Sequence, residues 1–139
     1  MAGRFVVDNS VVMSWCFRDE ANPYADSVLD GLVEASAIVP SIWPLEVINV
    51  LLVAERRKRI GAADSVRFAT LLSRLPIFVE QESLEGMMEG LLGLGRALNL
   101  SSYDASYLDL AMRKGVPLAT LDKGLIKAAK AVYVKILER

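Results

Sequence analysis

The sequence predicts an α/β fold in which helices cover both faces of a central, mostly parallel sheet of about five short strands. Short apolar runs rich in β-branched residues alternate with helical stretches along the chain, a pattern typical of parallel strands joined by helices. No repeat, linker or low-complexity tract interrupts it. With 139 residues, 53% of them hydrophobic, the chain can bury a core without disulfide staples. We therefore predict a single domain over residues 1–139.

The first half of the chain contains two predicted strands and three predicted helices. The strands are expected at residues 4–7 and 37–39, and the helices at residues 10–17, 20–34 and 42–59. Asn9 or Ser10 is the expected cap of the first helix, because short polar side chains bond the free amide groups of a helix start. The long third helix ends in the basic run Arg56-Arg57-Lys58-Arg59, where cations offset the helix dipole.

The second half continues the alternation with four helices and three strands. The helices are expected at residues 62–75, 83–98, 101–114 and 122–130, and the strands at 77–79, 118–121 and 132–136. Helical spacing predicts a buried face formed by Val66, Ala69, Leu72 and Leu75. The sequence Ser101-x-x-Asp104 resembles a capping box at a helix start.

The chain contains no histidine and a single cysteine, Cys16. Histidine-dependent catalytic triads and His-ligated zinc are therefore excluded. One thiol forms neither an internal disulfide nor a cysteine zinc site. Chemistry at an active site must use carboxylates, hydroxyls, lysine, arginine or a metal ion held by oxygen atoms.

The charge and hydropathy patterns bear on partners and location. Sixteen basic and 17 acidic residues give a net charge of −1, so no overall positive field attracts nucleic acid. No apolar stretch approaches the roughly 18 residues of a membrane-spanning helix, and Asp8 interrupts the first apolar run in a way that a signal peptide does not. We expect a cytoplasmic protein with no membrane partner.

Four carboxylates occupy positions that suggest a common site. Asp8 directly follows the first predicted strand and Asp122 the fourth, and open α/β sheets bind ligands at the carboxyl ends of their strands. Asp104 lies in the first turn of a predicted helix. Glu46 interrupts an apolar helix, with Asn49 on the same face.

Each acid also has a simpler structural interpretation. Asp8 and Asp122 are suitable helix caps, and Asp104 is the acidic member of the capping box. Glu46 suits a helix face that is partly exposed to water.

Four clustered carboxylates need a counter-charge, because like charges within about 4–6 Å raise one another's pKa. In a chain without histidine, a hard divalent cation supplies that charge, and ligation by oxygen alone favours Mg²⁺ or Mn²⁺. Such an ion orients a phosphate group and activates a bound water molecule. Once these four acids are set aside, 13 acidic residues remain against 16 basic ones, so the surface around the site need not repel RNA.

The segments RFVVDNSV, IWPLEVINVL, SSYDASYLDLA and LATLDKGL resemble the motifs of PIN-domain nucleases, and above all of VapC-type ribonuclease toxins of toxin–antitoxin pairs. The resemblance spans almost the whole chain and implies a three-layer α/β/α sandwich. The sequence departs from the family pattern at Asn9, where a small residue is more common in the family. The resemblance also implies that one or two Mg²⁺ or Mn²⁺ ions are bound by Asp8, Glu46, Asp104 and Asp122.

The same resemblance implies the reaction, the supporting residues and the partners. The reaction is endonucleolytic hydrolysis of RNA by a metal-activated water. Supporting polar roles are implied for Ser10, Asn49 and Thr120. The implied partners are a second copy of the chain, in a homodimer, and a VapB-like antitoxin whose tail masks the acidic pocket. We expect the antitoxin groove along residues 20–34 and 42–75.

Other functions compete with this hypothesis. A non-catalytic PIN-like module that binds RNA or protein has the same motifs. Two other phosphoryl-transfer classes fit poorly, because Asp8-Asn9-Ser10 lacks the Asp-x-Asp of dehalogenase-type phosphatases and no aspartate follows the predicted strand at residues 77–79, where receiver domains carry one. A phosphate-binding P-loop is also absent from the sequence.

Overall fold

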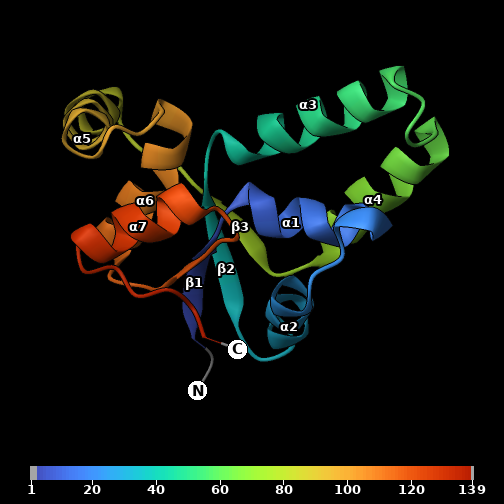
Figure 1. The fold of residues 1–139 in the computed structure, drawn as a ribbon, viewed down its shortest axis with the longest axis horizontal. Helices are drawn as coiled ribbons and strands as arrows, with labels where there is room; N and C mark the ends of the chain where they lie inside the picture. The colour runs from blue at the N-terminus through green and yellow to red at the C-terminus, as the bar shows by residue number, and fades with distance from the viewer. Residues whose placement is uncertain (1–2, 139) are drawn as a thin grey trace.

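A computed structural model describes residues 3–138 and confirms the α/β fold with a parallel sheet (Figure 1). The sheet has four strands in the order β3-β2-β1-β4, and every neighbouring pair is parallel. Val6 lies at the centre of the register, paired with Ile38 on one side and Leu118 on the other. The strands are β1 (Arg4–Val7), β2 (Ser36–Pro40), β3 (Ile77–Glu80) and β4 (Leu118–Ala119).

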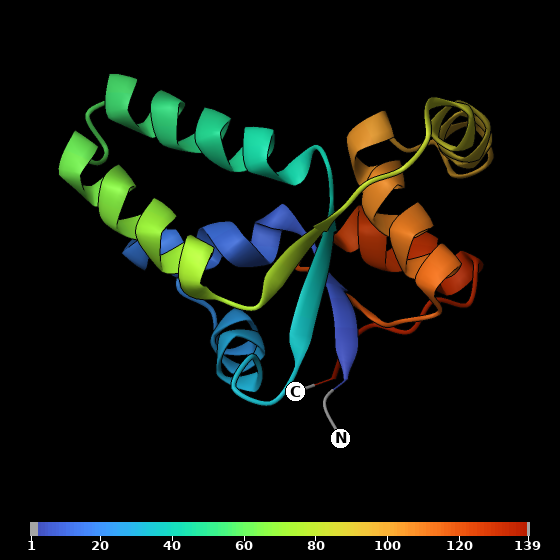
Figure 2. The same ribbon diagram turned by 180° about the vertical axis from the view of Figure 1, so that it is seen from behind.

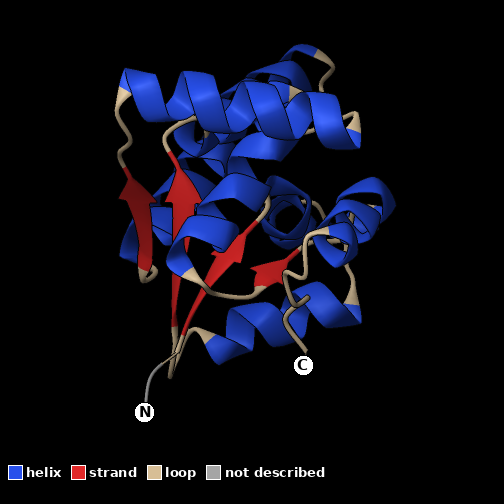
Figure 3. Cartoon of the chain, turned by 90° about the vertical axis from the view of Figure 1, so that its left-hand side faces the viewer, coloured by secondary structure: helices blue, strands red, loops and turns tan. Residues whose placement is uncertain are grey.

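Seven α-helices within residues 3–138 surround this sheet. They are α1 (Asn9–Cys16), α2 (Pro23–Gly31), α3 (Trp43–Arg56), α4 (Ala62–Arg74), α5 (Leu84–Leu98), α6 (Ser102–Lys114) and α7 (Lys123–Ala131), with a short 3₁₀ helix, η1 (Arg18–Glu20), after α1. Helices α1 to α4 lie on one side of the sheet and α5 to α7 on the other, as the two opposite views show (Figures 1 and 2). The side view shows the strand arrows pointing the same way between these helices (Figure 3). The predicted sandwich is therefore confirmed.

The core lies where the sheet meets α1 and α6. The strands contribute residues such as Val6, Val7 and Ile38, and the helices contribute Val12 and Leu108, all at most 1% exposed. Since β1 is hydrogen-bonded on both sides and covered on both faces, its apolar run is unbroken, as expected of a central parallel strand. Within residues 3–138, no helix combines the length and apolar character needed to cross a bilayer.

The sheet has four strands instead of the expected five, because residues 132–136 do not form a strand. This segment makes a single parallel bridge, between Ile136 and Leu118. Val132 ends α7, and Tyr133 has a φ of 61°, which lies in the left-handed region and breaks the extended conformation that pairing requires.

The structure also corrects local predictions. Asp8, and not Asn9 or Ser10, occupies the cap position of α1. Helix α2 begins only at Pro23, after a cap by the Asn22 side chain, because η1 occupies the preceding residues. On α4 the buried residues are Ser65, Phe68 and Leu72, whereas Val66 and Ala69 of the predicted face are exposed. The buried face of α4 is therefore rotated from the predicted one towards Ser65 and Phe68.

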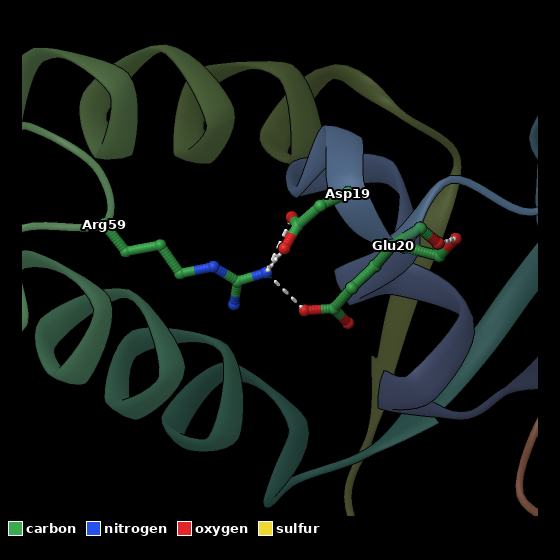
Figure 4. A network of polar contacts seen from close by, with 4 residues as sticks. Asp19, Glu20 and Arg59 are labelled. Carbon is green, nitrogen blue, oxygen red and sulfur yellow. Dashed lines mark hydrogen bonds and ion pairs between the residues drawn. The ribbon is translucent and has the colours of Figure 1, made fainter.

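Helices α3 and α4 form a hairpin that extends away from the sheet (Figures 1 and 2), and Arg59 ties it to the body of the domain. The Nη2 atom of Arg59 donates to both carboxylate oxygens of Asp19, at 2.8 and 2.9 Å, and to Glu20 at 2.7 Å (Figure 4). Its guanidinium carbon lies 3.8 Å from the centroid of the Phe17 ring. One residue of the basic run is therefore a structural anchor between the hairpin and η1.

Replacing Arg59 with alanine removes these ion pairs and the cation–π contact together. We expect the midpoint of thermal unfolding, followed by circular dichroism, to fall at low salt. The loss should shrink at high salt, because ions screen exposed charge pairs. Arg67→Ala, which removes an ion pair to Asp64 within α4 alone, is the control and should change the midpoint less. Equal midpoints for Arg59→Ala and the wild type would show that the anchor contributes nothing.

Candidate active site

The site lies at the carboxyl edge of the sheet, where the strand order reverses around β1. The chain passes from β1 to β2 on one side and returns later to β4 on the other, which is the position where open α/β sheets bind ligands. The amide of Asp8 donates to the carbonyl of Ala119 at 2.9 Å. The residues that follow β1 and β4 are thereby held side by side although 112 positions separate Asp8 from Thr120.

Asp8 is the most tightly held acid of the site, with 6% of its surface exposed. Its Oδ2 atom accepts hydrogen bonds from Thr120 Oγ1 at 2.6 Å and from Ser10 Oγ at 2.8 Å. These hydroxyls in turn accept the amide hydrogens of Asp122 and Leu121, each at 3.0 Å. The Asp8 side chain makes no capping bond to α1, so the capping interpretation does not hold. Within residues 3–138, Oδ1 receives no hydrogen bond.

Glu46 lies half-buried in the first turn of α3 and is contacted by Tyr107 of α6. The Tyr107 hydroxyl donates to Glu46 Oε1. Burial raises the pKa of Glu46, the bond from Tyr107 lowers it, and the negative charges of Asp8 and Asp104 raise it further. Burial, followed by the bond to Glu46, also raises the pKa of Tyr107, so this hydroxyl stays protonated.

The sequence analysis did not identify Tyr107 as a functional residue. It follows Asp104 by three positions on α6, so the two side chains share one face of the helix. That spacing is a usable signal, but it indicates core packing equally well, since Tyr107 is 1% exposed.

Asp104 lies in the first turn of α6, beside the Ser101 cap. The Ser101 hydroxyl accepts the amide hydrogen of Asp104 at 3.1 Å. Among the residues described, the Asp104 carboxylate makes no return bond, so the predicted capping box is only half formed. Burial raises the pKa of Asp104, and the negative charges of Asp8 and Asp122 raise it further.

Asp122 is the exposed member of the set and caps α7. Its Oδ2 atom accepts the amide hydrogen of Leu125 at 2.8 Å, so the capping interpretation is correct for that oxygen. Strand β4 ends at Ala119, and Asp122 therefore lies three residues beyond the strand instead of directly after it. Its other oxygen, Oδ1, receives no hydrogen bond from the described part of the chain.

The four carboxylates share one electrostatic environment. Asp8 and Asp104 act on Glu46, and Asp8 and Asp122 act on Asp104. None of the ion pairs found within residues 3–138 involves any of the four acids. The positive ends of helix dipoles offset part of this charge, because all four acids stand at a cap or in the first turn of a helix.

The donor set fits Mg²⁺ or Mn²⁺ in chemical type, since it consists of carboxylate oxygens with uncompensated negative charge. In the orientations shown, no three Asp, Glu or Cys side chains within residues 3–138 are grouped to hold one ion. The acids are therefore neighbours that do not converge on a point.

Two of the three predicted supporting residues contact a site acid, and the third does not. Ser10 and Thr120 contact Asp8 directly, as described above. Asn49 is exposed and makes no side-chain hydrogen bond to any residue the structure describes, because the α3 face that meets α6 carries Glu46 and not Asn49. The structure does not bring Asn49 into the network.

Comparison with known proteins places this geometry in a family. The family model of the PIN domain matches residues 5–131. The fold is similar to that of PAE2754 from Pyrobaculum aerophilum, with a TM-score of 0.70 and 24% identity over 92% of this chain and 87% of that one. It is also similar to FitAcB from Neisseria gonorrhoeae, with a TM-score of 0.58 and 14% identity over 96% of both chains.

At these identities the two structures support the fold alone. No curated protein matches the sequence. The family model, however, extends from β1 through α7 and includes all four acids. The chain therefore belongs to the PIN-domain family.

Proposed function

We propose that this PIN domain is a Mg²⁺- or Mn²⁺-dependent endoribonuclease whose catalytic and metal-binding residues are Asp8, Glu46, Asp104 and Asp122. PIN domains are generally nucleases, which supports a hydrolase acting on nucleic acid. The observation that carries the finer proposal is electrostatic. Burial raises the pKa of Glu46 and of Asp104, the negative charges of neighbouring site acids raise both further, and no described cationic side chain pairs with the four carboxylates.

Each residue of the proposed site has a role that follows from its contacts. Asp8 Oδ1, Glu46 Oε2 and Asp122 Oδ1 are free to bind a cation, because the protein bonds the other oxygen of each carboxylate. Ser10 and Thr120 hold Asp8 in place. Without a cation the acids repel an RNA phosphate, so substrate binding at this edge depends on neutralisation. A bound divalent ion supplies a Lewis acid and lowers the pKa of its water.

We also propose that the chain is the toxin of a toxin–antitoxin pair, with a VapB-like antitoxin on the α3–α4 hairpin. Leu45, Ile48 and Leu52 of α3 are 63%, 50% and 42% exposed and lie at helical spacing on one face. Val66 and Leu71 of α4 are exposed as well. The hairpin supports the predicted segment 42–75 better than 20–34, because the hairpin exposes several large apolar side chains whereas segment 20–34 exposes only Val33, which lies beyond the end of α2.

A homodimer completes the proposed assembly. Helix α5 has no buried residue, and Leu84, Met88 and Leu92, spaced four residues apart on one face, are 70%, 61% and 54% exposed. Exposed apolar stripes of this kind support association with another chain. We assign this face to the second copy because it lies across the sheet from the α3–α4 hairpin (Figure 1).

Cleavage of RNA tests the catalytic proposal. We expect the protein with Mg²⁺ or Mn²⁺ to cut RNA within the strand, and EDTA to abolish cleavage. Asp8→Asn should lower the cleavage rate by about 100-fold or more. Removing a metal ligand should reduce activity at least as much as removing a residue that only hydrogen-bonds to a ligand. Asp26→Asn, at an exposed position on α2, is the control and should cleave at the wild-type rate.

Two outcomes would contradict the proposal in different ways. Cleavage that survives both EDTA and Asp8→Asn would exclude the four-acid site. Tight RNA binding without metal-dependent cleavage would instead favour the non-catalytic PIN-like module.

The pH dependence of stability provides a second test. In EDTA, Glu46 and Asp104 have raised pKa values in the folded protein, so the folded state binds more protons than the unfolded state between the ordinary and the raised pKa. Stability should therefore fall as pH rises through that window and stay lower above it. Glu46→Gln should be more stable than the wild type at neutral pH, and this advantage should disappear as pH falls towards the ordinary glutamate pKa.

Thermal unfolding across a pH series measures this difference. Glu34→Gln, at an exposed turn position, is the matched control and should follow the wild type at every pH. Mn²⁺ should raise the midpoint of the wild type more than that of Glu46→Gln, because binding to the folded state stabilises it. A wild-type midpoint at neutral pH equal to or above that of Glu46→Gln in EDTA would show that burial and the neighbouring acids do not make ionised Glu46 destabilising as inferred.

Light scattering tests the proposed dimer. The wild type should have the mass of two chains, and Met88→Glu should have the mass of one, because it places a charge in the α5 stripe. Leu45→Glu is the matched control, since Leu45 is exposed to the same extent on α3, and it should remain dimeric. A monomeric wild type at high concentration would refute the homodimer.

A further inference from the structure

Three of the four acids share a pattern in which the protein holds one carboxylate oxygen and leaves the other free. Ser10 and Thr120 hold Oδ2 of Asp8, and the Leu125 amide holds Oδ2 of Asp122. Glu46 follows the same pattern, because its one side-chain partner among the described residues is the hydroxyl of Tyr107 on α6, 61 positions away, which donates to Oε1.

Tyr107 is almost fully buried, whereas Glu46 is only half-buried. Tyr107 is 1% exposed on α6, the helix that packs against β1, β2 and β4, and a tyrosine side chain has few free torsions. Glu46 has a long side chain and lies near the start of the α3–α4 hairpin, which leads away from the sheet (Figure 1). A free glutamate side chain loses rotamer entropy when it is ordered, so a fixed hydrogen-bond partner lowers the cost of binding an ion.

We propose that Tyr107 is a positioning residue of the site, whose hydroxyl fixes Oε1 of Glu46 and so keeps Oε2 available to a divalent cation. The inference rests on the proposed function and names the residue that holds the Glu46 side chain of that site. It extends to Glu46 the arrangement that Ser10 and Thr120 provide for Asp8.

If the Tyr107 hydroxyl had only a structural role, any hydrogen-bond acceptor would satisfy it. The same chain shows such a case in Tyr24, whose hydroxyl donates to the backbone carbonyl of Leu137 at 2.7 Å. Tyr107 donates to a site carboxylate instead. Mutating a residue that hydrogen-bonds to a metal ligand typically lowers metal affinity or activity by 10- to 100-fold. A loss of Mn²⁺ affinity of that size would distinguish a positioning role from the loss of one buried hydrogen bond, which affects stability.

Titration of the full-length protein with Mn²⁺ alone, by calorimetry without RNA, tests the proposal. We expect Tyr107→Phe to weaken Mn²⁺ binding by about 10-fold or more and to lower kcat for RNA cleavage with little change in KM. Tyr24→Phe, the matched control, should bind Mn²⁺ as the wild type does. Thermal unfolding in EDTA shows whether each variant is folded.

A double-mutant cycle shows whether Tyr107 acts through Glu46. Glu46→Asp keeps a carboxylate but withdraws it by one methylene from the Tyr107 hydroxyl. Adding Tyr107→Phe to Glu46→Asp should cause no further loss of Mn²⁺ affinity. Glu46→Asp alone should already weaken binding, which keeps the test valid if Tyr107→Phe does not fold.

The outcomes separate this inference from the function on which it rests. Wild-type Mn²⁺ affinity in Tyr107→Phe, or a full further loss in the Glu46→Asp background, would overturn the positioning role and leave the nuclease proposal standing. A wild-type protein that neither binds Mn²⁺ nor cleaves RNA would overturn both.

Discussion

Repulsion among four carboxylates at one edge of the sheet is the constraint to which the rest of the site responds. The protein offsets this repulsion without any described cationic side chain. Every one of the four acids stands at the cap or in the first turn of a helix, where unpaired amide groups and the helix dipole favour negative charge. Local hydrogen bonds then hold one oxygen on three of them.

The parallel pairing of β1 makes this arrangement possible. Because β1 is hydrogen-bonded to β2 on one side and β4 on the other, the helices that follow these three strands start at the same edge. Helix α6 packs against the sheet, and its N-terminus is the fourth helix start at this edge. The sheet thus gathers four helix N-termini, and with them four acids, from segments spread over more than a hundred residues. The pKa values of Glu46 and Asp104 are nevertheless raised, first by burial and then by the neighbouring acids.

The apolar surfaces of the domain are separated from this edge and from each other. The α3–α4 hairpin exposes one set of side chains and α5 another, on opposite sides of the sheet. Arg59 fixes the hairpin through its contacts with η1, which gives a partner a stable surface.

The sequence by itself determined the alternation of strands and helices up to α7 and the positions of Asp8, Glu46 and Asp104 relative to the ends of their elements. These features depend on short-range patterns: apolar periodicity, capping residues and β-rich runs. The tertiary structure decided which faces were buried, that residues 132–136 make only a bridge, that Asn49 stays outside the network, and that Tyr107 of α6 holds Glu46 of α3. Contacts between segments 61 positions apart depend on how the helices are oriented on the sheet, and side-chain packing between elements distant in the sequence sets that orientation, which no local pattern records.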